Sequence, residues 1–530
     1  MTHPVTPAAG RSDELILAID CGTQSVRALL FDADGELVAK SQLPLDDYVT
    51  PQPGWLEHDV DGFWNATAQA CRQLWQSHAH LRAAVRGVAV TTQRGTIMPI
   101  DAHGKALHPA LSWLDQRRAQ RVPPVSLLWR AAFRAAGVGE TVRYFQHQAE
   151  ANWWAEHRSE LWAKTHRFLL VSGLLNWKLT GRYVDSIGSQ VGYLPFDFKS
   201  HAWAGARDWK WQALAIRREQ LPDLLPVGSV LGEVSAEASE ATGIPRGLPV
   251  IAAAADKACE VLGSGCLEPH QGALSYGTTA TINVCTPRYV EPMPFVPPYP
   301  AALPGRFACE VQIFRGYWMV RWFKEQFGDR ELNAAAQAGV VPEVLFDGLV
   351  ASVPPGSMGL TLQPYWSPGI RHPGMDAKGA IIGFGDVHTR AHVYRAILEG
   401  LAYALRDGAE RIVKKTHTAI TELRVSGGGS QSDAALQLTA DIFRLPTSRP
   451  HTYETSGLGA AIDGAVAVGL HGDFATAVRR MTRIGRTFEP NAENAALYGE
   501  LYTQVYRRMY PRLAPLYARI RQITGYPEAD

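Results

Sequence analysis

Residues 15–24 of this chain, Leu-Ile-Leu-Ala-Ile-Asp-Cys-Gly-Thr-Gln, carry its strongest structural signal. The run up to the aspartate predicts a strand, because a short apolar run bounded by a turn signal is typical of a buried strand. Gly22 predicts a turn, and residues 25–32 predict a second strand. Asp34-Gly35 then stands between apolar runs, which is a strong hairpin signal, and a third strand is predicted over residues 37–41. The chain therefore opens with three predicted strands joined by tight turns.

The same pattern occurs again roughly half the chain length later. Residues 274–279 read Leu-Ser-Tyr-Gly-Thr-Thr, with strands predicted over residues 272–276 and 280–285. So long a spacing indicates two halves of related design rather than a short-period repeat. We therefore predict two α/β domains after a disordered polar segment, with boundaries at residues 1–14, 15–265 and 266–530.

The other periodic segments continue this mixture of strands and helices. Apolar runs predict strands over residues 87–91, 110–112, 248–255 and 423–426. Helical spacing of apolar residues predicts helices over residues 60–76, 391–415, 433–443 and 456–469. The region 125–180 is expected to be mostly helical, including an amphipathic stretch over residues 168–179.

The composition excludes several classes of function. The chain has 530 residues, 46% apolar and 19% charged, which is ordinary for a globular protein. Its 52 Lys and Arg nearly balance 51 Asp and Glu, with no basic run, so no nucleic-acid partner is expected. The six cysteines show no metal-ligand spacing. No apolar run reaches the roughly 18 residues of a membrane span, and the first residues lack a signal-peptide core. We therefore expect a cytoplasmic protein without a membrane partner.

The two Gly-Thr turns are candidates for phosphate binding. A phosphate needs backbone N–H groups and hydroxyls aimed at it, and glycine lets the backbone come close. Gly22-Thr23-Gln24 and Gly277-Thr278-Thr279 could therefore hold a polyphosphate from two sides. Either one alone could simply be a tight turn.

A glycine loop, Gly427-Gly428-Gly429-Ser430, lies between a predicted strand and the helix that begins at Asp433. Such a loop can bring a base or sugar close to the backbone and present a helix N-terminus to an anion. The chain has no GxxxxGK[ST] element, and no GxGxxG follows the first strand, so it is neither a P-loop nor a dinucleotide-binding protein by these signals.

Two aspartates follow predicted strands, where α/β folds place their ligand-binding side chains. Asp256 could accept a proton from an attacking hydroxyl group, or it could cap the following helix. Asp20 precedes the first Gly-Thr turn and could hold Mg²⁺ beside a triphosphate, or it could be a simple turn residue.

Two further segments of the first half suit a polyhydroxylated ligand. Gln93-Arg94 and Trp113-Leu114-Asp115 both follow predicted strands. An aromatic face can stack on sugar C–H groups, while Arg and carboxylate side chains bond hydroxyls. The same residues could also form surface loops around a core tryptophan.

Taken in chain order, these segments resemble the FGGY carbohydrate kinases of the actin/hexokinase/Hsp70 ATPase superfamily. The resemblance rests on seven stretches in family order, at residues 16–25, 93–96, 111–117, 256–265, 274–279, 425–446 and 454–461.

The resemblance implies two RNase H-like α/β domains around a central cleft, with sugar and catalytic base in the first and ATP in the second. Asp256 would be the general base and would contact the substrate together with Gln93, Arg94, Trp113 and Asp115. Asp20 would bind Mg²⁺. The resemblance further implies an ATP site formed by Gly22, Thr23, Gln24, Gly277, Thr278, Thr279, Gly428, Gly429, Ser430 and Asp433.

The sequence also departs from better-known relatives. Glycerol kinases carry Glu where this chain has Gly95, and xylulokinases carry a Met-His-Gly-type segment that is absent here. Lys257, directly after the expected base, is unusual for both groups. A small sugar or polyol is the expected substrate, with a pentulose such as xylulose the leading hypothesis. Members are often dimers, so a homodimer is an option, although no interface is visible in the sequence.

Two other readings of the chain stay open. One is a regulatory ATPase of the same superfamily without a sugar acceptor. The other is a catalytically silent sugar-binding protein. Release of ADP with and without sugar would separate both from a kinase.

Overall fold

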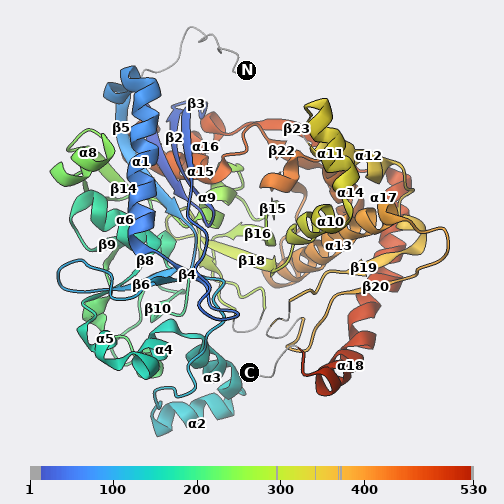
Figure 1. The fold of residues 1–530 in the computed structure, drawn as a ribbon, viewed down its shortest axis with the longest axis horizontal. Helices are drawn as coiled ribbons and strands as arrows, with labels where there is room; N and C mark the ends of the chain where they lie inside the picture. Colours follow the sequence, from blue (N-terminus) through green and yellow to red (C-terminus); the bar gives the residue numbers. More distant parts are fainter. Residues whose placement is uncertain (1–13, 294–295, 341, 368, 370–372, 527–530) are drawn as a thin grey trace.

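The computed structural model describes residues 14–293, 296–340, 342–367, 369 and 373–526. It contains two α/β units that lie side by side, the N-terminal one on the left and the C-terminal one on the right of Figure 1. The segment predicted to be disordered, residues 1–14, lies outside the described residues except for Glu14.

The first unit is built on a six-stranded sheet with the order β13-β14-β5-β1-β2-β3. Strand β1 pairs antiparallel with β2 and parallel with β5, and β5 pairs parallel with β14. The three strands predicted at the start of the chain are present, the third being longer than predicted. The bounds are β1 Leu15–Cys21, β2 Ser25–Asp32, β3 Leu37–Pro44, β5 Val85–Thr92, β13 Val230–Glu233 and β14 Pro249–Ala252.

The second unit repeats this arrangement in a seven-stranded sheet with the order β17-β18-β16-β15-β21-β22-β23. Strand β15 pairs antiparallel with β16 and parallel with β21, as β1 does with β2 and β5. The predicted relation between the halves is therefore present in the topology, and both units have an RNase H-like core. The bounds are β15 Gln271–Tyr276, β16 Ala280–Thr286, β17 Tyr299–Pro300, β18 Phe307–Ile313, β21 Glu422–Ser426, β22 Thr447–Pro450 and β23 Ile484–Phe488.

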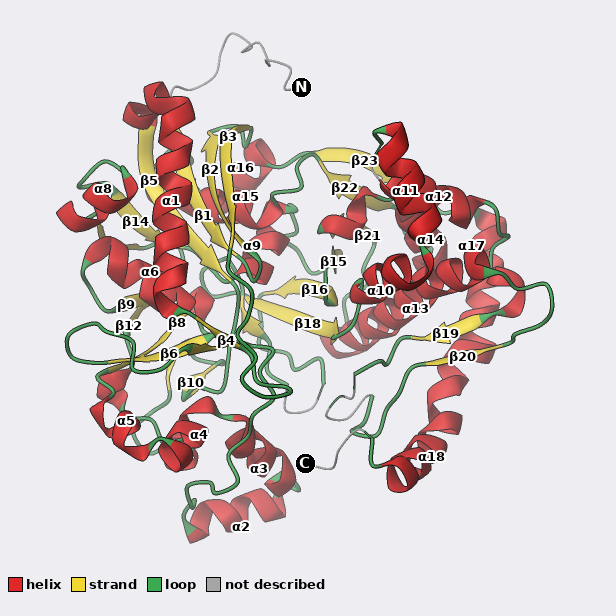
Figure 2. Ribbon diagram, viewed as in Figure 1, coloured by secondary structure: helices red, strands yellow, loops and turns green. Residues whose placement is uncertain are grey.

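Helices cover both faces of the first sheet (Figure 2). Alternate residues of β1 point to opposite sides, because side chains alternate along a strand. Leu15, Leu17 and Ile19 pack with one group of helices, and Ile16 and Ala18 pack with the other. The first group is α1 Val60–His78, α6 Val171–Thr180 and α8 Ala236–Thr242; the second is α9 Asp256–Gly263, α15 Thr455–Ala467 and α16 Phe474–Met481.

The largest core of the chain lies in the second unit, around the long helix α13. This helix lies against strands β16 and β18, as it does on the right of Figure 1. The helices of this core are α10 Trp318–Phe327, α12 Pro342–Ala351, α13 Arg390–Thr416, α14 Asp433–Phe443 and α17 Ala492–Leu501. The last helix, α18 Arg507–Thr524, extends away from it in Figure 1.

Two helices from the C-terminal half of the sequence belong to the core of the first unit. Leu458, Ala461 and Ile462 of α15 and Met481 of α16 are buried against the first sheet. Helices α15 and α16 follow the predicted boundary at residue 266 in the sequence, but they pack with the first unit.

The amphipathic helix predicted over residues 168–179 is confirmed for residues 171–179 and wrong for residues 168–170. Strand β8, Arg167–Leu170, pairs with β6, Ile97–Ile100, and α6 begins only at Val171. Strand pairing with a distant segment outweighs the local helical spacing here, because Phe168, Leu169 and Leu170 become buried in the sheet.

Helices α9 and α15 pack at very short distance through two glycines. A methyl group built on Gly459 would lie 1.9 Å from the Cys259 carbonyl oxygen, and one on Gly263 would lie 2.0 Å from that of Thr455. Only glycine fits at either position, because both neighbours are helix backbone that cannot move without separating the helices.

Gly459→Ala should therefore lower stability, although alanine alone favours a helix over glycine by about 1 kcal/mol. Overpacking typically costs about 1–3 kcal/mol, and we expect a loss at the upper end, measured by thermal unfolding. Gly472→Ala is the matched control, because nothing lies within 4 Å of a methyl group there. Equal melting temperatures for both variants would contradict the close packing.

Candidate active site

A cavity of about 1170 Å³ lies between the two units. It receives strand ends from both sheets, as expected for a ligand site at the carboxyl ends of parallel strands. Most of the residues predicted to bind ATP line it. The lining from the first unit includes Gly22, Thr23, Gln24, Arg27, Trp113, Asp256 and Lys257, and that from the second includes Gly277, Thr278, Thr279, Tyr317, Lys324, Asp347, Gly428, Gly429 and Ser432.

The first Gly-Thr turn is held from behind by Gln93. The Gln93 amide donates to the Gly22 carbonyl at 3.3 Å and accepts from the Thr23 hydroxyl at 3.3 Å. Thr23 also accepts from the Trp113 indole at 3.1 Å. Gln93 is buried and supports the turn, and the substrate contact predicted for it stays a prediction.

The glycine loop faces the cavity beside an aromatic stack. A methyl group on Gly429 would lie 2.4 Å from the Tyr317 ring, so only glycine fits. The Tyr317 ring stacks on Tyr276 with a centroid distance of 4.3 Å. Loop and ring together form an apolar wall suited to a flat base.

Two residues predicted to bind ATP do not line this cavity. The Ser430 hydroxyl is buried and donates to the Gly427 carbonyl at 2.7 Å. Asp433 pairs with Arg449 at 2.6 Å and with Arg486. Ser432 and Asp347, which hydrogen-bond one another, stand at the cavity instead. Residues Gly428–Gln431 form a one-turn helix. The run of glycines in the sequence did not predict this turn.

Asp256 is the first residue of α9 and lines the cavity. The helix cap is Ala255, so Asp256 is not the helix N-cap that its position allowed. The Asp256 carboxylate accepts from the Lys257 backbone N–H at 2.7 Å. Burial raises the pKa of Asp256, while the positive charges of Lys257 and Arg94 oppose that rise. A carboxylate with a raised pKa beside a cavity is suited to accept a proton.

Asp20 is the last but one residue of β1, two positions before Gly22, and is buried behind the residues that line the cavity. Its carboxylate accepts from Arg27 at 2.9 Å. Burial raises the pKa of Asp20 to about 6, with Arg27 opposing and the charges of Asp256 and Glu454 adding to the rise. In the described residues, no cluster of three or more His, Cys, Asp or Glu could hold a metal alone. One buried carboxylate with another nearby fits Mg²⁺, which usually keeps waters and takes ligands from phosphates.

Arg94 joins the two units instead of projecting into the cavity. Its guanidinium donates to both carboxylate oxygens of Glu310, on β18, at 3.1 and 2.9 Å. The Tyr299 ring lies 5.1 Å from the guanidinium carbon. The pair is largely buried, with Arg94 15% and Glu310 5% exposed. The sequence contains no signal that would have linked Arg94 to Glu310.

Asp115, also predicted to contact substrate, supports the wall of the cavity. Its carboxylate accepts from the Leu56 backbone N–H at 2.7 Å and from Arg117 Nε at 2.8 Å. It is not among the cavity residues, whereas its neighbours Trp113 and Leu114 are. The Asp115 carboxylate is already hydrogen-bonded to Leu56 and Arg117, and the substrate contact predicted for it stays a prediction.

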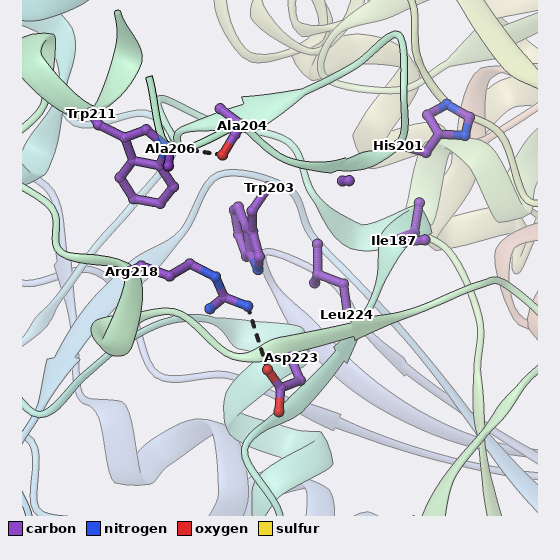
Figure 3. Close-up of a pocket in the computed structure, with 10 residues that line it drawn as sticks. Ile187, His201, Trp203, Ala204, Ala206, Trp211, Arg218, Asp223 and Leu224 are labelled. Carbon is purple, nitrogen blue, oxygen red and sulfur yellow. Dashed lines mark hydrogen bonds and ion pairs between the residues drawn. The ribbon is translucent and has the colours of Figure 1, made fainter. Parts of the chain in front are cut away.

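A second hollow of about 670 Å³ lies in the first unit, away from the predicted site residues (Figure 3). Trp203 and Trp211 line it, together with Arg218 and Asp223, which pair at 3.4 Å. Both indole N–H groups donate to backbone carbonyls, those of Pro222 and Ala204, so the tryptophans are held as part of the wall.

Fold and cleft together define a two-domain protein with RNase H-like units, both of which contribute a Gly-Thr turn to one cavity. Residues 15–263 match the N-terminal domain of the FGGY family of carbohydrate kinases, and residues 272–468 match its C-terminal domain. The chain therefore belongs to the FGGY family of carbohydrate kinases, which are phosphotransferases. Family membership implies ATP as the phosphoryl donor and a small sugar as the acceptor.

Similar proteins cover nearly the whole chain. An uncharacterised sugar kinase of Escherichia coli K12, YgcE, is 29% identical over 494 residues, which is 92% of this chain and 91% of the relative. A glycerol kinase of Acidovorax sp. JS42 is 30% identical over 86% of this chain and 91% of its own. The crystal structure of a xylulose kinase from Rhodospirillum rubrum aligns with a TM-score of 0.79 at 25% identity, over 95% and 100% of the two chains.

No helix in the described part of the chain has both the length and the apolar character to cross a membrane.

Glu310→Gln should destabilise the protein by about 3 kcal/mol, because it leaves the buried Arg94 guanidinium without its charged partner. The measurement is thermal unfolding, and Glu325→Gln is the control. Glu325 pairs with Arg321 at 2.6 Å on the surface, where loss of an ion pair changes stability by at most about 1 kcal/mol. Equal effects of both substitutions would show that the pair between the units contributes no more than a surface pair.

Proposed function

We propose that this kinase transfers the γ-phosphate of ATP to a hydroxyl group of a small sugar or polyol, with Asp256 as the general base. The observation that carries the proposal is that Asp256 lines the same cavity as both Gly-Thr turns. A carboxylate between two phosphate-binding turns lies where an acceptor hydroxyl must attack.

In this mechanism Asp256 takes the proton of the acceptor hydroxyl as its oxygen bonds to the γ-phosphorus. The bond between that phosphorus and the β–γ bridging oxygen breaks, and ADP leaves. The protein's contribution to such a transfer is mainly position and charge stabilisation. The backbone at Gly22 and Gly277 would bind phosphates, and Gly428, Gly429 and Tyr317 would hold the adenosine.

Asp20 would hold Mg²⁺ at the phosphate side of the cleft. When bound, the ion neutralises charge on the phosphates and orients them. Arg27, which lines the cavity, pairs with the Asp20 carboxylate at 2.9 Å and holds it in place.

The acceptor would lie near Trp113, which lines the same cavity as Asp256. Gly95 has a φ of +70°, and a methyl group there would lie 3.3 Å from Trp113 Cβ, so the backbone disfavours a larger side chain. The glutamate that glycerol kinases carry at this position is therefore disfavoured in this chain. A pentulose such as xylulose is the leading candidate, in line with the structurally similar xylulose kinase.

A panel of ketoses, polyols and sugar acids, assayed for ADP formation with Mg-ATP, tests the proposed activity. Sugar-dependent ADP release supports a kinase. Release that no sugar changes would favour an ATPase, and saturable sugar binding without turnover would favour a silent binding protein.

Asp256→Ala should reduce sugar-dependent ADP formation by at least about 10³-fold, since general base catalysis typically contributes about 10²–10⁴-fold. Binding of ATP, measured by calorimetry, should stay within about threefold. A folded Asp256→Ala variant with near-normal turnover would rule out this role for Asp256.

Binding of Mg-ATP should weaken as the pH falls through about 6, because Asp20 then takes up a proton and loses its negative charge. The raised pKa has the opposite consequence for folding, since the burial penalty of the ionised carboxylate grows as the pH rises from about 4 to 6. Asp20→Asn should weaken Mg-ATP binding about tenfold at pH 7.5 and remove the pH step. Binding of ATP without Mg²⁺ is the control, and an unchanged pH step in the variant would assign it to another group.

A further inference from the structure

Lys257 follows the proposed base directly and lines the same cavity. Its ammonium group donates to Glu260 Oε2 at 2.7 Å and to the Ser275 hydroxyl at 2.6 Å. An ammonium group has three N–H donors, so one is left without an acceptor in the part of the chain that the structure describes. The side chain is 20% exposed, which leaves that donor available to a ligand in the cavity.

Glu260 keeps this ammonium group charged and in one place. Its other carboxylate oxygen accepts from the Ser275 hydroxyl at 2.9 Å and from the Ser426 hydroxyl at 2.7 Å. Lys257 and these hydroxyls lower the pKa of Glu260 despite its burial, so the carboxylate stays ionised. The hydrogen bonds of Lys257 and Glu260 therefore connect helix α9 with strands β15 and β21. The second Gly-Thr turn follows β15, and the glycine loop follows β21.

The ammonium group lies beside the second Gly-Thr turn. A methyl group built on Gly277 would be 4.0 Å from Lys257 Nζ. The backbone N–H of the same lysine donates to the Asp256 carboxylate at 2.7 Å. One residue thus contacts the proposed base with its backbone and faces the phosphate turn with its side chain.

We propose that Lys257 binds the γ-phosphate of ATP and stabilises the charge that develops on it during transfer. This inference rests on the proposed function and assigns a further catalytic residue to it. The covalent changes remain those given above, with the acceptor proton on Asp256. Lys257 stays protonated throughout and donates a hydrogen bond to a phosphoryl oxygen. A fixed charged donor at such a position is typically worth about 10²–10³-fold in rate.

The competing explanation is that Lys257 has a structural role only and connects helix α9 to strand β15 through its hydrogen bond to Ser275. The two explanations differ in what they predict for nucleotides that carry or lack a γ-phosphate. Binding of the non-hydrolysable analogue AMP-PNP and of ADP, both with Mg²⁺ and without sugar, therefore distinguishes them.

Lys257→Gln should weaken AMP-PNP binding about tenfold and ADP binding less than twofold, and should lower kcat about 10²–10³-fold. Lys257→Arg should recover part of both losses, because it restores the charge. Lys210→Gln is the matched control, since Lys210 is 18% exposed and paired with Asp208 outside the cleft. It should leave both affinities and kcat unchanged.

An equal loss of AMP-PNP and ADP binding in Lys257→Gln, or no loss of either, would overturn the inference. If Asp256→Ala abolishes turnover while Lys257→Gln keeps the wild-type ratio of affinities, the proposed function stands and this inference fails. If Asp256→Ala retains turnover while Lys257→Gln lowers the ratio of AMP-PNP affinity to ADP affinity, the role of Lys257 stands and that of Asp256 fails.

Discussion

The close packing of helices α9 and α15 is the constraint on which the cleft depends. At Gly263 and Gly459 each helix approaches the backbone of the other, and no side chain fits between them. Helix α9 also contacts both units, because Cys259 packs under the first sheet while Val261 packs with Ala273 of the second. The position of the N-terminus of α9, and with it Asp256, is therefore set by backbone contact and not by a flexible loop.

Several charges in and beside the cleft occur as ion pairs. Arg27 pairs with Asp20 and with Glu454, the residue that precedes α15. Lys257 pairs with Glu260, and Arg94 joins Glu310 across the units. Burial raises the pKa of Asp20 and acts to raise that of Glu260, while Arg27 and Lys257 oppose this effect. These two cations therefore favour the ionised form of both carboxyl groups.

Much of the architecture could be predicted from local patterns. The strand, Gly-Thr turn and strand at residues 15–24 recur at residues 274–279, and both form as predicted because short apolar runs and glycine turns are local signals. The prediction failed at β8, where pairing with β6 determined the structure. Local patterns also did not indicate that Gln93 supports the first turn or that Asp115 bonds Leu56, since residue type does not determine which protein group a side chain will bond.

Residue order alone was sufficient for the two-unit α/β plan, the two Gly-Thr turns, the glycine loop and an aspartate after an apolar strand, because each depends on neighbours within a few positions. Three features were decided by tertiary structure. These are the placement of α15 on the first sheet, the Arg94–Glu310 pair and the hydrogen bond from the Lys257 ammonium group to Ser275 on β15. Each joins segments that packing brings together, and Arg94 and Glu310 stand 216 positions apart. A local pattern contains no information on such contacts, because they depend on which surfaces of the two sheets meet.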